Sequence, residues 1–135
     1  MRLLLDTHML LWWLADDSRL KPKARALIEN PENTVFVSVV SLWEIAVKVR
    51  IGKLEADIVE VVDTLGNGGF TVLNIGSLHL AALVTLQRSA DHNDPFDHLL
   101  VAQAIVEGAS LVTNDEKLRR YPITLVEASG RTRVR

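Results

Sequence analysis

The chain has 135 residues, 48% of them hydrophobic and 24% charged, which supports one compact domain and excludes an intrinsically disordered class. Cysteine is absent, and this excludes a disulfide framework, a thiolate zinc site and a cysteine nucleophile. The net charge of −2 counts mildly against a nucleic-acid-binding protein, unless bound cations neutralise an acidic pocket.

The apolar stretch near the N-terminus does not have the pattern of a signal peptide. Asp6 and His8 interrupt it, and Asp16-Asp17 follow where a cleavage site would have small residues. No segment reaches the roughly 18 uninterrupted apolar residues that a membrane helix needs. We therefore expect a cytoplasmic protein without a membrane span.

The first half of the chain alternates predicted strands and helices. Strands are expected at Arg2–Leu5, a short apolar run, and at Thr34–Ser38, which is rich in β-branched and aromatic residues. Proline, asparagine and glycine delimit the helical stretches between and after these strands. Four helices are expected here: His8–Leu14, Leu20–Asn30, Val40–Arg50 and Asp57–Leu65.

The second half continues the alternation after the turn at Gly66-Asn67-Gly68-Gly69. Strands are expected at Thr71–Ile75, Ser110–Thr113 and Thr124–Glu127, helices at Leu78–Gln87 and Pro95–Glu107, and a polar loop at 89–93. Strands separated by helices imply parallel βαβ units, so we predict a three-layer α/β/α sandwich. Residues 1–127 would form this domain, and residues 128–135 a loose, basic C-terminal tail.

Four carboxylates occupy positions where such a sheet binds ligands. Asp6 follows the first strand and Asp115 the fourth, while Glu44 and Asp97 lie early in the helices that begin near Val40 and Pro95. In an open parallel sheet, ligands bind beyond the carboxyl ends of the strands, at the point where strand order reverses. If strands one and four are neighbours there, the four acids converge on one pocket.

Each acid also has a purely structural interpretation. Asp6 and Asp115 could cap the short helices that follow them, and Asp97 could interact with the positive end of its own helix dipole. Asp94 has the position of a helix cap, before Pro95. Glu44 and Lys48 have the i,i+4 spacing of an ordinary surface pair. The apolar neighbours of Glu44, Leu42-Trp43 and Ile45-Ala46-Val47, argue against a fully solvated carboxylate.

The four acids would act together if they were ligands of one divalent cation site. Mg²⁺ prefers oxygen ligands and takes one or two carboxylates while keeping several waters. Such an ion lowers the pKa of bound water and offsets the negative charge that grows when a phosphodiester is attacked. Without the ion, a carboxylate cluster would repel a phosphate backbone.

Four sequence blocks, in order, resemble the PIN-domain family and more narrowly the VapC-type toxins of bacterial toxin–antitoxin pairs. The blocks are LLLDTHMLLWWL (3–14), SVVSLWEIAVKVRIGKL (38–54), HNDPFDHLLVAQAIVEG (92–108) and LVTNDEKLRRY (111–121). The resemblance runs from Leu3 to about Val126. It implies a sandwich with strand order 3-2-1-4-5 and a metal-dependent endoribonuclease that uses Mg²⁺ or Mn²⁺.

The resemblance also implies a role for each acid. Asp6 and Asp97 would be the primary metal ligands, and Glu44 and Asp115 would complete the catalytic site. Hydrogen bonds to these ligands are expected from Thr113 and Ser41, with Thr7 as the weaker candidate. Two positions depart from the family pattern, because Asn93 and His98 stand where related sequences often have arginine.

Partners follow from the same resemblance: an RNA substrate, a cognate antitoxin that inserts a segment near the site, and a second copy of the chain in a homodimer. The histidines lack the spacing of a zinc helix motif, so we interpret them as structural or surface residues. Trp12, Trp13 and Trp43 are expected mainly in the core, although one of the adjacent pair could belong to a contact with a partner.

Other readings of the acids fit less well. A phosphoacceptor receiver domain needs adjacent acids after its first strand and an aspartate after its third, whereas this chain has only Asp6 and then Asn74-Ile75-Gly76. A haloacid-dehalogenase-like phosphatase needs an aspartate where His8 stands. The remaining alternative is a catalytically silent PIN-like module that binds RNA or protein, and the four intact acids argue against it.

Overall fold

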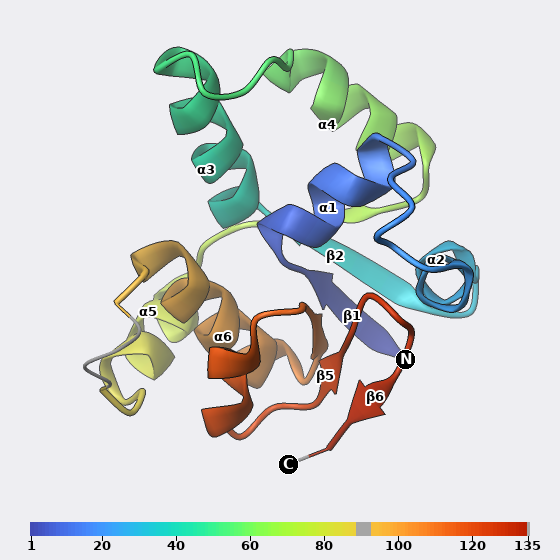
Figure 1. Ribbon diagram of the computed structural model, residues 1–135. Helices are drawn as coiled ribbons and strands as arrows, with labels where there is room; N and C mark the ends of the chain where they lie inside the picture. The colour runs from blue at the N-terminus through green and yellow to red at the C-terminus, as the bar shows by residue number, and fades with distance from the viewer. Residues whose placement is uncertain (89–92, 135) are drawn as a thin grey trace.

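A six-stranded sheet with helices on both faces forms the centre of the computed structural model, which describes residues 1–88 and 93–134 (Figure 1). The strand order is β3-β2-β1-β4-β5-β6. The strands are β1 (Arg2–Leu5), β2 (Thr34–Ser38), β3 (Thr71–Leu73), β4 (Ser110–Val112), β5 (Leu125–Val126) and β6 (Thr132–Arg133). The helices are α1 (Thr7–Leu14), α2 (Pro22–Glu29), α3 (Val39–Arg50), α4 (Ile58–Asn67), α5 (Ser77–Val84) and α6 (Pro95–Glu107), followed by the 3₁₀ helix η1 (Glu116–Arg120).

The first five strands pair in parallel, which confirms the predicted three-layer sandwich and its order 3-2-1-4-5. The expectation of a loose tail is wrong for Thr132–Arg133. These two residues form β6 and pair antiparallel with β5. The Glu127 carboxylate fixes the strand, because Arg133 Nε donates to its Oε1 over 2.6 Å and Arg119 Nη2 over 3.1 Å.

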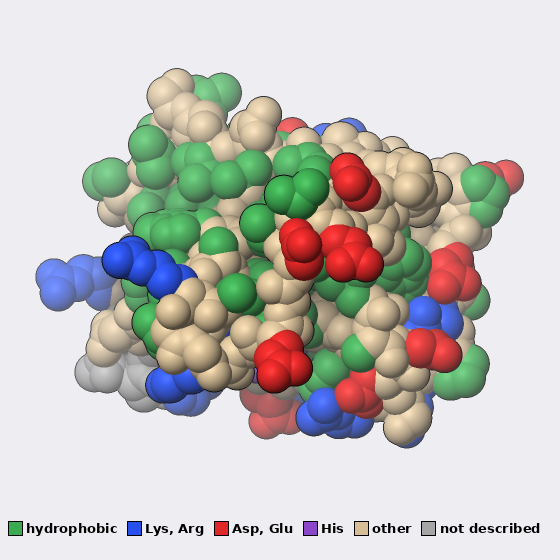
Figure 2. Space-filling model, turned by 90° about the horizontal axis from the view of Figure 1, so that it is seen from above, with side chains coloured by type: hydrophobic (Ala, Val, Ile, Leu, Met, Phe, Trp, Pro, Cys, Tyr) green, Lys and Arg blue, Asp and Glu red, His purple; other side chains and the backbone are tan. Residues whose placement is uncertain are grey.

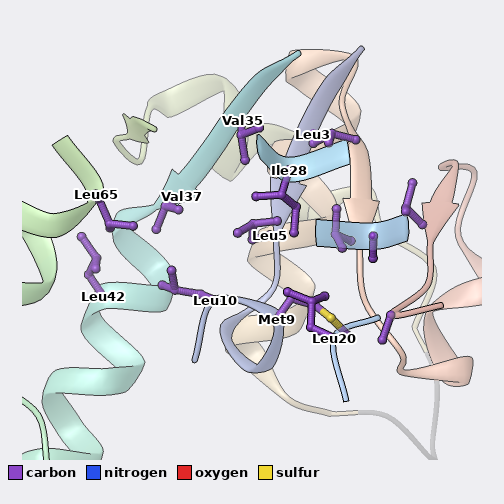
Figure 3. Close-up of a cluster of buried hydrophobic side chains, with 14 of the residues drawn as sticks. Leu3, Leu5, Met9, Leu10, Leu20, Ile28, Val35, Val37, Leu42 and Leu65 are labelled. Carbon is purple, nitrogen blue, oxygen red and sulfur yellow. The ribbon is translucent and has the colours of Figure 1, made fainter. Parts of the chain in front are cut away.

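Alternating side chains of the strands supply two cores, one on each face of the sheet. Leu3, Leu5 and Val37 belong to a cluster on the face that α1, α2 and α4 cover (Figure 3). Leu4 and Phe36 point the other way and pack against α6 and η1. This alternation follows from the two-residue period of a strand, and it explains why the buried strands read as continuous apolar runs.

Most expected element bounds differ from the observed ones by only a few residues. Helix α4 continues through Gly66 and Asn67, which were expected to form a turn, because Leu65 remains buried and anchors the last turn. Strand β3 ends at Leu73 rather than at Ile75. The polar loop expected at 89–93 lies outside the described residues except for Asn93. No helix in the described part of the chain is long and apolar enough to span a membrane.

Strand order reverses at β1, and this reversal positions the site. The chain leaves β1 toward β2 on one side, whereas β4 joins β1 on the other side only after α6. The backbone N–H of Asp6 donates to the Val112 carbonyl over 3.0 Å, which ties the end of β1 to the end of β4. This edge is the topological switch point at which open α/β sheets bind ligands.

Candidate active site

Asp6 lies at the switch point with its carboxylate buried. The side chain caps α1, since Met9 N–H donates to Oδ1 over 2.8 Å, as the structural interpretation predicted. Burial raises the pKa of Asp6 above its ordinary value, and the negative charge of Glu44 adds to the rise. Hydrogen bonds from Thr113 and from Met9 N–H oppose the rise only in part. Capping alone therefore does not account for a carboxylate held out of water.

Glu44 is also buried, with 8% of its surface exposed, so its pair with Lys48 is not an ordinary surface pair. The Thr7 hydroxyl donates to Glu44 Oε1 over 2.7 Å, and Lys48 Nζ lies 2.9 Å from Oε2. Ser41 Oγ is 3.1 Å from Thr7 Oγ1. The first residue of α1 and the second turn of α3 thus hold this carboxylate between them. Thr7, expected to be the weaker donor, contacts Glu44 directly, whereas the described hydrogen bond of Ser41 is to Thr7.

Asp115 is connected to Asp6 through Thr113. The Thr113 side chain hydrogen-bonds to Asp6, and its Oγ1 accepts from Asp115 N–H over 3.0 Å. Thr113 is buried because it directly follows β4, the strand next to β1. The Asp115 side chain also accepts from Lys117 N–H and so caps η1. We call Asp6, Thr7, Ser41, Glu44, Lys48 and Thr113 the acidic cluster.

Asp97 lies in the first turn of α6, half-buried. Asp94 caps this helix, since its Oδ1 accepts from Phe96 N–H over 2.9 Å and from Asp97 N–H over 3.4 Å. Of the two departures from the family pattern, Asn93 is exposed and His98 packs its ring 6.4 Å from that of Tyr121. Asp94 therefore has the capping position that its sequence context predicted.

Figure 2 shows the end of the molecule at which α1, α3 and α4 lie, and acidic side chains gather near the middle of this face. Within residues 1–88 and 93–134, however, no three His, Asp or Glu side chains are arranged to hold a metal ion. The structure links Asp6 with Glu44 and, through Thr113, with Asp115; the ligand set of four stays a prediction.

The donor chemistry of the acidic cluster nevertheless fits a hard divalent cation. Asp6 and Glu44 offer carboxylate oxygens, Lys48 pairs with Glu44 over 2.9 Å, and the charge of His8 acts to lower the pKa of Asp6. Two buried carboxylates beside one ammonium leave an excess of negative charge in a region of low dielectric constant. A metal ion would offset that charge, and Mg²⁺ needs only one or two carboxylates because it keeps several waters.

The sequence reasoning missed the importance of Lys48 and the exposure of Trp43. The signal for Lys48 was its i,i+4 spacing from a glutamate with apolar neighbours, which indicates that the ion pair is partly buried. Trp43 was expected in the core, but it is 54% exposed and packs edge-on against Phe96 at 4.8 Å between ring centroids. Trp12 and Trp13 are half-buried.

Comparisons with known proteins identify the family of this chain. The family model of the PIN domain matches residues 3–123. The chain is 32% identical to ribonuclease VapC22 of Mycobacterium tuberculosis over 127 residues, 90% of this chain and 96% of that protein.

Solved structures share the fold at lower identity. VapBC2 from Rickettsia felis, bound to a DNA fragment from its promoter, has a chain with a TM-score of 0.73 and 21% identity, covering 94% of this chain and 98% of that chain. DNA-bound VapBC from Salmonella typhimurium has a chain with a TM-score of 0.67 and 14% identity. The match covers 95% of this chain and 98% of that chain. With the matched family model, the resemblance to VapC22 and the acids at the switch point, this chain belongs to the PIN-domain family.

Proposed function

We propose that the chain is a metal-dependent endoribonuclease, the cytoplasmic toxin of a toxin–antitoxin pair, which hydrolyses RNA phosphodiester bonds. The observation that carries the proposal is the pair of buried carboxylates, Asp6 and Glu44, at the switch point of a PIN-family sheet. The name of the relative, ribonuclease VapC22, supports the reaction class.

In this proposal, Asp6 and Asp97 are the primary ligands of Mg²⁺ or Mn²⁺, and Glu44 and Asp115 complete the site. The bound ion would supply a nucleophilic water of lowered pKa and offset charge on the phosphate. The side chains of the protein orient the carboxylates. Thr7 holds one oxygen of Glu44, Thr113 holds Asp6, and the burial of both carboxylates excludes bulk water.

An antitoxin segment would lie in a groove of about 610 Å³ between α1 and the start of α4. Leu11, Trp12 and Val61 are among its apolar lining residues, and its acidic lining residues outnumber Arg19, which pairs with Asp17 over 2.7 Å. A segment with apolar and basic side chains would match this lining. The acidic lining residues are Asp17, Glu55, Asp57 and Glu60.

A homodimer belongs to the same proposal. Large apolar side chains of α5 remain exposed, with 70% for Leu78, 49% for Leu80 and 85% for Val84. Exposed apolar side chains on one helix are typical of a surface that another chain covers. Trp43 on α3 would be a further candidate for burial in such an interface.

The test of the proposed function is cleavage of a mixed cellular RNA pool by the purified chain with Mg²⁺ or Mn²⁺, and with chelator. Asp97→Asn should lower the cleavage rate about a hundredfold or more, because an amide is a weaker ligand than a carboxylate and carries no charge. The matched control is Asp94→Asn, one turn earlier, since asparagine caps helices as well as aspartate does.

An Asp97→Asn variant that cuts as fast as the parent chain would remove Asp97 from the site. A parent chain that neither cuts RNA nor gains thermal stability from Mn²⁺ would contradict the nuclease proposal. The silent binding module would then be the better description.

A further inference from the structure

Lys48 is the most exposed side chain of the acidic cluster. It stands one helical turn beyond Glu44 on α3, and 35% of its side chain is exposed against 10% for Glu44. Its ammonium is therefore paired with a buried carboxylate, while part of its side chain contacts solvent. A lysine ammonium has three N–H donors, and the described ion pair with Glu44 Oε2 spans 2.9 Å.

Both oxygens of Glu44 are already engaged. Oε1 accepts from the Thr7 hydroxyl over 2.7 Å, and Oε2 is paired with Lys48. A divalent cation that binds Oε2 brings a second positive charge beside the ammonium, and the repulsion favours moving Lys48 away, whereas the Thr7 hydrogen bond can persist and keep the carboxylate in its orientation. Lys48 and the metal ion compete for the same oxygen.

A displaced ammonium is free to pair with another anion. The cation that displaces it also repels it, and its flexible four-carbon stem allows the ammonium to turn toward solvent. A polyanion that approaches a site made of carboxylates needs positive charge at the rim, and lysine is a common point-charge ligand of phosphate. A backbone phosphate of bound RNA satisfies both requirements.

We propose that Lys48 alternates between two anions: it neutralises Glu44 while no divalent cation is bound, and it contacts an RNA phosphate when the cation takes Glu44. The proposal rests on the proposed function, because it takes Glu44 as a metal ligand and RNA as the substrate. It predicts that removing the lysine changes metal affinity and RNA affinity in opposite directions.

The first measurement is Mn²⁺ binding by isothermal titration calorimetry to the full chain and to Lys48→Gln. The variant should bind Mn²⁺ about two- to fivefold more tightly, because the metal no longer displaces an ammonium from Glu44. Lys53→Gln is the matched control. Lys53 is an exposed lysine just beyond the end of α3, and its substitution should leave the Mn²⁺ affinity unchanged.

The second measurement is binding of a short single-stranded phosphorothioate RNA in the presence of Mn²⁺, at several salt concentrations. Lys48→Gln should weaken binding about fivefold and reduce the slope of log K against log salt by about 0.7, the loss of one phosphate contact. Lys48→Arg keeps the charge and should stay within about twofold of the parent chain in RNA affinity.

The outcomes separate the two proposals. If the parent chain binds no Mn²⁺, the proposed function itself fails. If the parent chain binds Mn²⁺ and RNA, but Lys48→Gln binds Mn²⁺ no more tightly or RNA no more weakly, the role of Lys48 is overturned and its ion pair with Glu44 is only structural.

Discussion

Two buried polar clusters in this molecule differ in how much negative charge they hold. The second cluster joins α5, α6 and the end of β2 and consists of Ser38, His79, Gln103 and Glu107; we call it the glutamine cluster. Ser38 donates to Gln103 Oε1, and Gln103 Nε2 donates to the Asn74 carbonyl over 3.3 Å. Ser38 and Gln103 therefore find neutral hydrogen-bond partners within the fold.

His79 completes the glutamine cluster with both ring nitrogens. Its Nδ1 accepts from Gly76 N–H over 2.9 Å, which leaves the proton on Nε2 for the Glu107 carboxylate 2.9 Å away. Glu107 also pairs with Arg2 at 3.4 Å. Every carboxylate here has a donor or a cation, and the result is a structural cluster that fastens α5 and α6 to the sheet.

The acidic cluster differs in its charge rather than in its hydrogen bonding. It holds two buried carboxylates; burial raises the pKa of Asp6, the charge of Glu44 adds to the rise, and Lys48 pairs with Glu44. Buried polar groups that are fully hydrogen-bonded stabilise a fold, whereas buried charge without compensation destabilises it. A cationic ligand is therefore expected at the acidic cluster, where two carboxylates are buried together, rather than at the glutamine cluster.

The largest expected effect is on the glutamine cluster. Gln103→Ala should lower the free energy of unfolding by about 3 kcal/mol, because it opens a cavity, leaves the Ser38 O–H without its acceptor and removes the hydrogen bond to the Asn74 carbonyl. Urea denaturation measures this loss. The increase in melting temperature on adding Mn²⁺ should persist in the variant, and its disappearance would show that the two clusters are not independent.

A smaller effect of opposite sign is expected for Asp6→Asn without metal. The pKa of Asp6 is raised in the folded state, so the folded chain holds this proton more tightly than the unfolded chain. Stability is therefore lost as pH rises from the unfolded pKa through the folded one, and the deficit remains at neutral pH. Asparagine has no proton to lose and should melt about 2–5 °C higher near neutral pH.

Melting curves in chelator from about pH 4 to pH 7 test this prediction. The gap between Asp6→Asn and the parent chain should widen as pH rises. Asparagine can still cap α1, so a variant that melts lower across the whole range would mean that the carboxylate stabilises the fold, and the contrast between the clusters would break down.

The smallest effect is expected for Glu107→Gln. The amide oxygen can still accept from His79 Nε2–H, and the lost pair with Arg2 is half exposed. A change in unfolding free energy of about 0.5 kcal/mol or less is expected from urea denaturation. A loss several times larger would mean that the glutamine cluster also depends on charge, which would blur the distinction from the acidic cluster.

Much of the fold was determined by local sequence. The runs Arg2–Leu5 and Thr34–Ser38 carry apolar side chains on both faces, which only a strand covered on both sides can bury, and both coincide with β1 and β2. Pro95 and Gly108 delimit α6 at its two ends, since proline fits the first turn and Gly108 takes the left-handed conformation with φ of 62°. The four acids were identified by their positions after strands and early in helices.

Tertiary structure alone decided three things. Strand β6 forms because Arg133 and Arg119 form ion pairs with Glu127, and no local sequence pattern predicts these pairs. Glu44 is buried because α3 packs against α1. Its i,i+4 pair with Lys48 therefore lies at the edge of the core instead of on an exposed helix surface. Thr113 joins Asp6 to Asp115 because β4 lies beside β1, although about a hundred residues separate them in sequence. Local preference sets which elements form, whereas burial and charge pairing depend on neighbours that only the folded chain brings together.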